Sequence, residues 1–442
     1  MLGLTSTPSF TLRPYQDAAV TKGLAYLQDP ALRDRHGLIV APTGSGKSLV
    51  IAGIATQLRH PCLVFQPSKE ILEQNMAKLQ AYGYRPAVFS ASFGKREIGS
   101  ITLATIGSVI RHIHYFREMP YVLVDECHGV NAKEGMYKTF FSALPHVRIL
   151  GLTATPYRLV TDGYGGSILK FLTRTRPRVF RDVVQATDIN YLFREGYLSP
   201  LVYDERPVIK RDRLRLNTTG ADYTDASVQQ HFHEIDFAGY LLHVVSEQLR
   251  AGRKNVLVFT RFVEESQQLV DRLPAGTAAI VSADTPADER ARILEDFKAG
   301  RIRVVSNVGV LAVGFDYPGL ECVVLARPSV SLALYYQMVG RDIRPVYAPG
   351  MPLDTLEQRH AAIAAGPKPR AYVVDLVGLV QLFGKIEHLK LRRGGKTGEQ
   401  WQVFSETRPL TNVYFGQRDQ DRSDAHGAAA AAEGLVGRGA RW

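Results

Sequence analysis

Residues 41–48, with the sequence APTGSGKS, are of the types that hold a phosphate group. Gly44 and Gly46 let the backbone curl so that successive N–H groups point inward at a phosphate. Lys47 adds a mobile positive charge, and the hydroxyl of Ser48 is suited to a magnesium ion. The segment therefore predicts a nucleotide site with bound Mg²⁺. Two further loop residues complete the predicted cradle: Thr43 and Ser45.

The elements on either side of this loop fit the same interpretation. The apolar run at residues 37–40 has the pattern of a buried strand entering the loop, and residues 48–60 have that of a helix leaving it. The N-terminus of this helix adds the positive end of a dipole at the phosphate.

Two adjacent carboxylates follow the hydrophobic stretch YVLV at residues 121–124. At the carboxyl end of a parallel strand, such groups lie in the crevice where ligands bind. Asp125 is placed to hold the magnesium ion through water, and Glu126 to orient or deprotonate an attacking water. His128 is expected to relay the state of the ligand to the rest of the protein.

A third group of reactive side chains occurs in residues 335–345, YYQMVGRDIRP. With helical spacing, Gln337, Arg341 and Arg344 fall at i, i+4 and i+7 and project from one face. Planar guanidinium groups spread positive charge over a transferring phosphoryl group, so these residues have the character of arginine fingers. On another side of the same helix, two residues are expected to pack inward: Val339 and Ile343.

Weaker signals lie where two other strands are expected to end. Residues 313–316 predict a tight loop in which Asp316 touches a ribose or Arg341. Thr153 and Thr155 follow an apolar run, and we expect their hydroxyls to join the two halves of the molecule by hydrogen bonds.

The elements that must position these side chains form two α/β blocks. In each block, short apolar runs alternate with amphipathic segments, a pattern typical of parallel strands buried on both faces. A helix is expected over residues 285–300, with Thr285 as its cap. The predicted strands are residues 37–40, 62–66, 101–106, 121–126 and 148–154 in the first block, and 255–260, 278–282, 302–307, 322–327 and 372–376 in the second.

The composition is that of a globular protein with a polyanionic partner. The 442 residues are 45% hydrophobic and carry a net charge of +11, which favours nucleic acid. Cys62, Cys127 and Cys322 are too scattered for a disulfide framework or a zinc site. Because no signal-peptide pattern or apolar run of 18 residues occurs, we expect a cytoplasmic protein with no membrane partner.

Two segments outside these blocks differ in character. Residues 201–236 are polar and basic, and we expect them to connect the blocks. Residues 385–396 carry five Lys or Arg against one Glu. Residues 418–442 are rich in Ala and Gly without a packing pattern, so we expect them to be disordered.

Taken in order, the motifs across residues 10–380 resemble those of superfamily 2 helicases of the DEAD/DEAH-like kind. More narrowly, residues 191–203, 218–228 and 373–384 resemble the bacterial RadD-type DNA repair helicases and their phage-encoded relatives. The motifs of the broader resemblance are RPYQ (13–16), APTGSGKS, PSKEILEQ (67–74), ATIGS (104–108), VDECH (124–128), TATP (153–156), VFTRF (258–262), VGFDYP (313–318) and YQMVGRDIRP (336–345).

The resemblance implies two tandem RecA-like (P-loop) parallel-sheet domains of the α/β class, with ATP in the cleft between them. It implies that Arg13 and Gln16 read the adenine edge, and that contacts to nucleic acid go mainly to phosphates. The implied domains are residues 1–200 and 237–384, joined by the connector and followed by a tail at 385–442. The implied groove residues are Ser68, Lys69, Thr105, Gly107, Thr260, Arg261, Ser306 and Asn307.

Two features depart from the RadD-type pattern. Such proteins tend to carry a C-terminal cysteine cluster for zinc, whereas this sequence has no cysteine after Cys322; the basic stretch at 385–396 is a candidate substitute. Asp342 stands where relatives usually have a small residue, and we expect it to pair with Arg341 or another base.

Together these inferences predict an ATP-dependent DNA helicase or translocase that remodels branched DNA, such as forks and recombination or repair intermediates. Three alternatives stay open: an RNA helicase on the same motor, the motor subunit of a restriction-type complex, and a binding protein that uses ATP as a clamp. The carboxylate pair and the two arginines argue against the clamp, because holding ATP does not require them.

Overall fold

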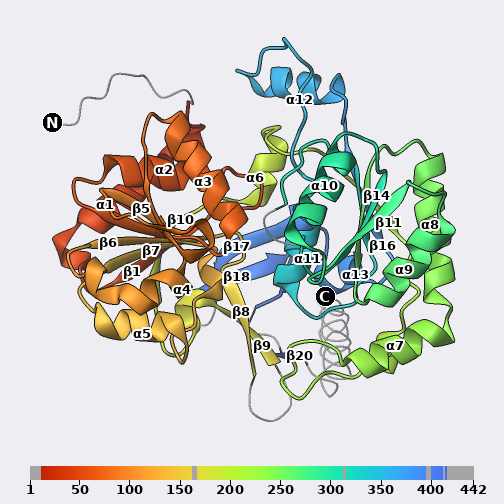
Figure 1. The fold of residues 1–442 in the computed structure, drawn as a ribbon, viewed down its shortest axis with the longest axis horizontal. Coiled ribbons are helices and arrows are strands. Elements are labelled where there is room, and N and C mark those ends of the chain that lie inside the picture. Colours follow the sequence, from red (N-terminus) through yellow and green to blue (C-terminus); the bar gives the residue numbers. More distant parts are fainter. Residues whose placement is uncertain (1–10, 162–166, 312–314, 395–399, 412–413, 416–442) are drawn as a thin grey trace, which may run out of the picture.

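Two sheets lie side by side in the computed structural model, each with helices packed on it (Figure 1). The structure describes residues 11–161, 167–311, 315–394, 400–411 and 414–415. We call the part built on the first sheet the first domain, and the part built on the second sheet the second domain.

The first sheet has eight strands in the order β10-β1-β7-β6-β2-β5-β3-β4. Neighbouring strands are parallel except β3 and β4. The strands are β1 (His36–Val40), β2 (Cys62–Phe65), β3 (Ala87–Ser90), β4 (Lys95–Arg96), β5 (Ile101–Ala104), β6 (Tyr121–Asp125), β7 (Arg148–Thr153) and β10 (Phe180–Ala186).

Both faces of this sheet are buried, which explains why its strands are continuously apolar. Ile39 packs in a cluster with α1 (Pro14–Gln28), α2 (Lys47–Gln57) and α3 (Lys69–Ala81). Its neighbours Leu38 and Val40 point to the opposite face, where they join α4 (Ile106–Val109) and α5 (Met136–Ala143).

The second sheet has six parallel strands in the order β11-β16-β15-β12-β14-β13. Its strands are β11 (Leu201–Glu205), β12 (Val256–Thr260), β13 (Ala278–Val281), β14 (Val304–Val308), β15 (Cys322–Leu325) and β16 (Ala371–Asp375). Helix α6 (Ile189–Arg194) follows β10 of the first sheet. The helices of the second half are α7 (Asp225–Glu234), α8 (Phe237–Arg250), α9 (Val263–Arg272), α10 (Ala287–Lys298), α11 (Leu332–Val339), α12 (Leu356–Ala364) and α13 (Leu379–Phe383).

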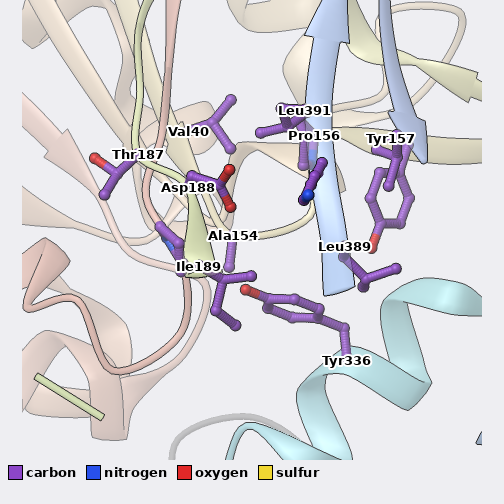
Figure 2. A pocket seen from close by; sticks show the side chains of 13 residues that line it. Val40, Ala154, Pro156, Tyr157, Thr187, Asp188, Ile189, Tyr336, Leu389 and Leu391 are labelled. Atoms are coloured by element: carbon purple, nitrogen blue, oxygen red, sulfur yellow. The ribbon is translucent and has the colours of Figure 1, made fainter. Parts of the chain in front are cut away.

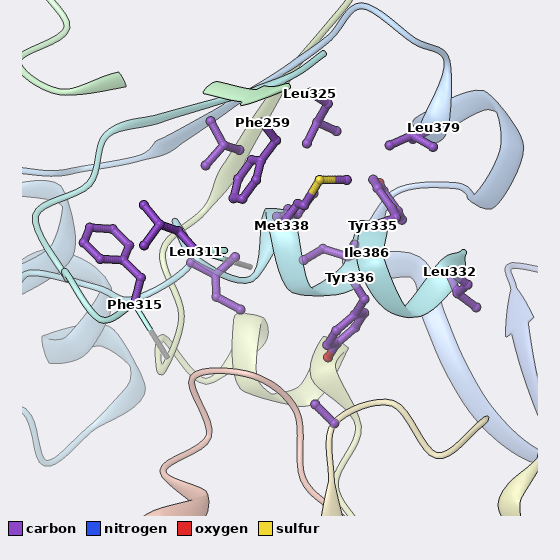
Figure 3. Packing of buried hydrophobic residues seen from close by; sticks show 14 of the residues in the cluster. Phe259, Leu311, Phe315, Leu325, Leu332, Tyr335, Tyr336, Met338, Leu379 and Ile386 are labelled. Carbon is purple, nitrogen blue, oxygen red and sulfur yellow. The ribbon is translucent and has the colours of Figure 1, made fainter. Parts of the chain in front are cut away.

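Helix α11 lies between the two domains. In Figure 3, Met338 points toward Phe259 and Leu325 of the second sheet, whereas Tyr336 points the other way. One buried cluster contains residues from both sheets, so the domains share a continuous apolar contact. Two small antiparallel sheets complete the fold: β8 (Tyr157–Thr161) with β9 (Ser167–Phe171) and β20 (Tyr414–Phe415), and β17 (Leu389–Gly394) with β18 (Gln400–Ser405) and β19 (Arg408–Pro409).

The two parallel sheets confirm the predicted α/β class, and each predicted strand overlaps an observed one. The connector prediction for residues 201–236 was wrong at its start, because β11 pairs in parallel with β16 as the edge of the second sheet. The basic stretch at 385–396 contributes β17. Residues 418–442, predicted to be disordered, lie outside the described residues.

A smaller correction concerns Thr285, which does not cap α10. Its hydroxyl accepts a hydrogen bond from the N–H of Ser282 at 2.9 Å, and the helix begins one residue later, after Pro286. The turn before the helix therefore uses this side chain. Among the described residues, no helix is long and apolar enough to span a bilayer.

Candidate functional site

The glycine-rich loop connects β1 to α2, as predicted. Gly44 and Gly46 adopt positive φ angles of 77° and 79°, a conformation that L side chains rarely adopt. A Cβ atom on Gly46 would lie 2.4 Å from Nε2 of Gln16. The loop is therefore closely packed as well as tightly curled, and it requires glycine at this position.

Gln16 braces this loop from the adjacent helix. Its Nε2 donates to the carbonyl of Ser45 at 2.7 Å, and its Oε1 accepts from the N–H of Arg13 at 2.9 Å. The guanidinium of Arg13 lies 4.3 Å from the ring centre of Tyr197. The two residues predicted to read adenine thus lie together beside the P-loop.

One cavity brings together most of the predicted catalytic and nucleotide-binding residues. From the first domain it is lined by the P-loop and by the carboxylates that follow β6. From the second domain it is lined by Asp316 and by the segment that begins with α11. The predicted residues among them are Thr43, Gly44, Gly46, Lys47, Ser48, Asp125, Glu126, Asp316, Gln337, Arg341 and Arg344. Ser45 is buried within the loop behind this surface.

The two carboxylates after β6 have different surroundings. Asp125 is buried and accepts from Nδ2 of Asn75 at 3.1 Å, and burial raises its pKa. Glu126 has a positive φ of 48° and forms an ion pair with Lys47. Burial opposes its charge, but Lys47 and His128 hold its pKa below the usual range. Glu126 is therefore ionised and held by the lysine that was predicted to bind phosphate.

His128 joins the carboxylate to the strand beside it. Its Nδ1 lies 2.9 Å from Oγ1 of Thr153, 3.1 Å from Oγ1 of Thr155 and 3.3 Å from Oε2 of Glu126. The expectation that the two threonines would link the domains was wrong, because these buried hydroxyls bond to His128 within the first domain. The network connects Glu126 to the end of β7.

The arginine segment is not the continuous helix that its spacing suggested. Helix α11 carries Gln337 but ends at Val339, so Arg341 and Arg344 lie in the turn that follows. A Cβ atom on Gly340 would lie 2.8 Å from Cγ2 of Thr43, so the backbone of this turn packs closely against the P-loop. The two arginines reach the cavity through the turn and not through a shared helix face.

Both arginines already have partners in the cavity. Arg344 forms an ion pair with Asp316, and Nη1 of Arg341 donates to the carbonyl of Phe315 at 2.7 Å. Burial lowers the pKa of Arg341 to about 10. Asp316 was expected to touch Arg341 or a ribose, whereas its ion pair is with Arg344. Gly314, in the same predicted loop, lies outside the described residues.

Asp342 points away from the cavity and is held by Lys368. The side chain of Asp342 is 0% exposed and that of Lys368 is 2% exposed, and Nζ of Lys368 lies 3.4 Å from Oδ1. The same Nζ donates to the carbonyl of Asp342 at 2.7 Å. Burial raises the pKa of Asp342 and lowers that of Lys368. This pair fixes the turn between the two arginines.

The groove residues predicted in the first domain lie at exposed or half-buried positions after β2 and β5. Ser68 caps α3, and Lys69 is exposed, with Nζ 5.3 Å from the ring centre of Phe93. The hydroxyl of Thr105 lies 2.9 Å from that of Ser108. A Cβ atom on Gly107 would meet only a sulfur atom at 3.7 Å, so a ligand has room to approach it.

The groove residues predicted in the second domain are not exposed. Thr260, Ser306 and Asn307 are buried in neighbouring parallel strands. The hydroxyls of Thr260 and Ser306 both bond to Ser266. Oδ1 of Asn307 accepts from the N–H of Leu311, whereas its Nδ2 has no partner among the described residues. Arg261 forms ion pairs with Asp222 at 3.2 Å and with a second carboxylate. As folded here, these four residues pack within the second domain, and their contact with phosphates stays a prediction.

Three residues near the site were missed by sequence reasoning. Ile71 and Gln74 line the cavity, and Asn75 donates to Asp125. All three belong to α3, which begins directly after the cap Ser68. Helical spacing from that cap was the signal that could have identified them.

Two family models match this chain, one in each domain. Residues 9–158 match the family described as type III restriction enzyme, res subunit, and residues 239–345 match the helicase conserved C-terminal domain. The chain is 28% identical over 313 residues to a 51.5 kDa protein of Lactococcus phage (isolate 7-9), which covers 70% of this chain and 62% of the relative. It therefore spans less than two thirds of that protein's length.

Two further proteins are similar over most of this chain. The DNA 3'-5' translocase XPB2 of Sulfurisphaera tokodaii is 23% identical over 367 residues, which cover 75% of this chain and 78% of the relative. The DNA-bound ATP-dependent type ISP restriction-modification enzyme LlaBIII shares the fold with a TM-score of 0.57 and 18% identity, over 85% of this chain and 28% of that one. The chain belongs to the superfamily 2 helicases of the DEAD/DEAH-like kind, with two tandem RecA-like domains.

Proposed function

We propose that this protein is an ATP-dependent DNA helicase or translocase. The observation that carries the proposal is the single cavity that the P-loop and carboxylates of one domain share with the glutamine and arginines of the other. Because each domain supplies only part of the site, ATP favours contact between the domains and product release favours their separation.

The residues of the cavity fit a magnesium–triphosphate ligand. The Ser48 hydroxyl and the Asp125 carboxylate are oxygen ligands of the kind that Mg²⁺ prefers, and the ion would neutralise charge on the phosphates. Lys47 exchanges its partner Glu126 for phosphate oxygens. Glu126, thereby released, orients or deprotonates the attacking water.

The second domain completes the catalytic arrangement. Arg344 leaves Asp316 and, with Arg341, spreads positive charge over the transferring phosphoryl group. Gln337 lies on the same wall, where its amide is suited to position the water. Asp316, once free of its ion pair, faces the nucleotide ribose.

We propose DNA as the nucleic acid. One similar protein is named a DNA translocase and another was solved bound to DNA, and the net charge of +11 suits a polyanion. The resemblance to RadD-type repair helicases supports branched DNA, such as forks and repair intermediates, as the substrate. Each cycle of domain contact and separation moves this DNA by a step.

Steady-state ATP turnover with a panel of nucleic acids tests the proposal. We expect DNA to stimulate turnover, and forks or four-way junctions to be unwound faster than matched RNA duplexes. Faster unwinding of RNA would identify an RNA helicase. ATP turnover that neither DNA nor RNA stimulates would identify an ATP-dependent clamp instead.

A second candidate is the motor of a restriction-type complex, favoured by the family match of residues 9–158 and by the fold shared with LlaBIII. Such a motor moves along duplex DNA without separating its strands. Displacement of a third strand from a triplex, with no release of either duplex strand, would favour this candidate. Co-purification with a nuclease subunit would identify its partner.

A further inference from the structure

The antiparallel hairpin of β17 and β18 follows both family matches, which end at residues 158 and 345. Its two strands pair in one register, with Leu391 opposite Val403 and Arg393 opposite Trp401. Alternate residues of a strand point to opposite faces. These two pairs therefore lie on the same face, the first near the base of the hairpin and the second toward its end.

The base of the hairpin is fixed between the two domains. Leu389 and Val403 are buried and line an apolar cavity together with Ala154 and Ile189, which follow strands of the first sheet, and Tyr336 of α11. Figure 2 shows Leu389 and Leu391 on β17 facing this cavity across from Tyr336 and Ile189. The hairpin is therefore held against residues of both domains.

The far end of the hairpin is basic and aromatic. Arg392 and Arg393 are exposed, and the guanidinium of Arg393 lies 5.4 Å from the ring centre of the half-buried Trp401. A guanidinium that lies over an indole is held in place by the cation–π attraction and keeps its N–H groups available.

The described acidic residues of this segment are engaged elsewhere. Glu387 accepts from the hydroxyl of Tyr203 at 2.7 Å, and Glu406 pairs with His388 at 3.1 Å. Among the residues that the structure describes, no ion pair involves Arg392 or Arg393. Both arginine side chains are exposed.

We infer that the β17–β18 hairpin is a nucleic-acid contact in which Arg392 and Arg393 bind backbone phosphates and Trp401 stacks on a base. The inference rests on the proposed function and extends it to a surface outside the helicase motifs. The guanidinium of Arg393 beside the Trp401 indole matches the two parts of a nucleotide, its phosphate and its base. Arg392 lies on the opposite face of the hairpin, where it meets a neighbouring phosphate of the same strand. Because the hairpin base contacts both domains, a strand held at its far end is mechanically connected to the interface that ATP closes.

The test is the salt dependence of binding to a fluorescent 30-mer of deoxythymidine, measured without ATP. Each phosphate contact that is lost lowers the slope of log affinity against log salt by about 0.7 for single strands. We expect Arg392→Gln/Arg393→Gln to lower the slope by about 1.4 and to weaken affinity about tenfold at low salt. An unchanged slope would overturn the inference, whatever the affinity.

Arg33→Gln/Arg85→Gln is the matched control. Both residues are exposed and precede β1 and β3, so they lie at the amino ends of the strands, whereas the P-loop follows the carboxyl end of β1. This double variant removes the same charge and is expected to leave the slope unchanged. An equal loss in this control would show a general charge effect and would overturn the inference.

Abasic DNA tests the stacking contact separately. Trp401→Ala is expected to weaken the affinity for normal DNA several-fold and to change the affinity for abasic DNA little. Trp401→Phe is expected to retain most of the affinity for normal DNA. Equal losses on both DNAs would overturn the stacking assignment.

The proposed function fails by a different result, which is wild-type ATP turnover that DNA does not stimulate. The hairpin inference fails when DNA stimulates wild-type turnover while the double variant keeps the wild-type salt slope. A hairpin that binds a partner protein and not DNA would give this result, in which DNA stimulates turnover and the salt slope is unchanged.

Discussion

On the first wall of the cavity, Lys47 and Ser48 begin α2 and Asp125 ends β6, whereas on the second wall Arg341 and Arg344 follow the end of α11. The first wall therefore takes its geometry from the junctions of regular elements. The second takes it from a turn whose shape depends on contacts distant in sequence, above all Lys368.

Both walls nevertheless keep their charges paired in the same way. Lys47 is held by Glu126, and Arg344 is held by Asp316. A triphosphate that enters the cavity must exchange both pairs. The difference is that the first exchange releases a catalytic carboxylate, whereas the second releases a catalytic arginine, so the two walls respond to one ligand with complementary chemistry.

The largest effect is expected on the second wall. Arg344→Ala should lower ATP turnover by about 10³-fold or more while ATP affinity changes much less, because the guanidinium acts on charge that develops in the transition state. Single-turnover hydrolysis and nucleotide binding measure the two quantities. Equal losses in both would mean that Arg344 is structural and that the second wall contributes no chemistry.

The corresponding change on the first wall is Glu126→Gln. We expect ATP to bind and turnover to fall by about 10²–10⁴-fold, because the water loses its base. The exposed Glu118→Gln serves as the control. Wild-type hydrolysis in Glu126→Gln would remove the carboxylate from the mechanism and leave the arginine wall as the main source of catalysis.

Lys368→Met tests whether the second wall depends on a distant contact. It leaves Asp342 buried without its partner, so we expect a loss of about 3–5 kcal/mol in the free energy of unfolding. Burial raises the pKa of Asp342, so its ionised form is the destabilising one, and the loss grows as pH rises from 6 to 8.

Thermal unfolding at the two pH values measures this loss. Lys368→Met/Asp342→Asn should recover most of the stability, because the buried charge is gone. A single variant as stable as the wild type at pH 8 would show that the arginine turn holds its shape without the ion pair.

The smallest effect is expected beside the P-loop. Gln16→Ala removes a hydrogen bond to the Ser45 carbonyl and the amide proposed to read adenine, so ATP affinity should fall roughly three- to tenfold. GTP affinity should change less, which competition binding would measure, with the exposed Gln230→Ala as control. Equal losses for both nucleotides would assign Gln16 to bracing the loop alone.

The first wall was predictable because its residues act within a few positions of one another. Gly44 and Gly46 shape a loop between a strand and a helix, and Asp125 ends an apolar strand. For the second wall, the sequence identified the residue types but not the turn that presents the two arginines. Gly340 and Pro345 are typical of a helix end, and this signal was overlooked in favour of the i, i+4, i+7 spacing.

In the second domain, three residues that the resemblance assigned to the nucleic-acid groove are buried. Thr260 and Ser306 lie in adjacent central strands, and both of their hydroxyls bond to Ser266 of α9. Asn307 points to the opposite face of β14, where its Oδ1 accepts from the N–H of Leu311. The motif could not reveal this, because a strand residue faces the core or the surface according to its neighbours in the sheet.

By itself, the sequence determined the two parallel sheets, the P-loop and the carboxylates after β6, since apolar periodicity and glycine geometry act locally. Only the tertiary structure decided which charges pair: Lys47 with Glu126, Arg344 with Asp316 and Lys368 with Asp342. Lys368 and Asp342 are 26 residues apart in the sequence, and Lys47 and Glu126 are 79 residues apart. Their meeting depends on how the sheets and turns pack, which no local pattern encodes.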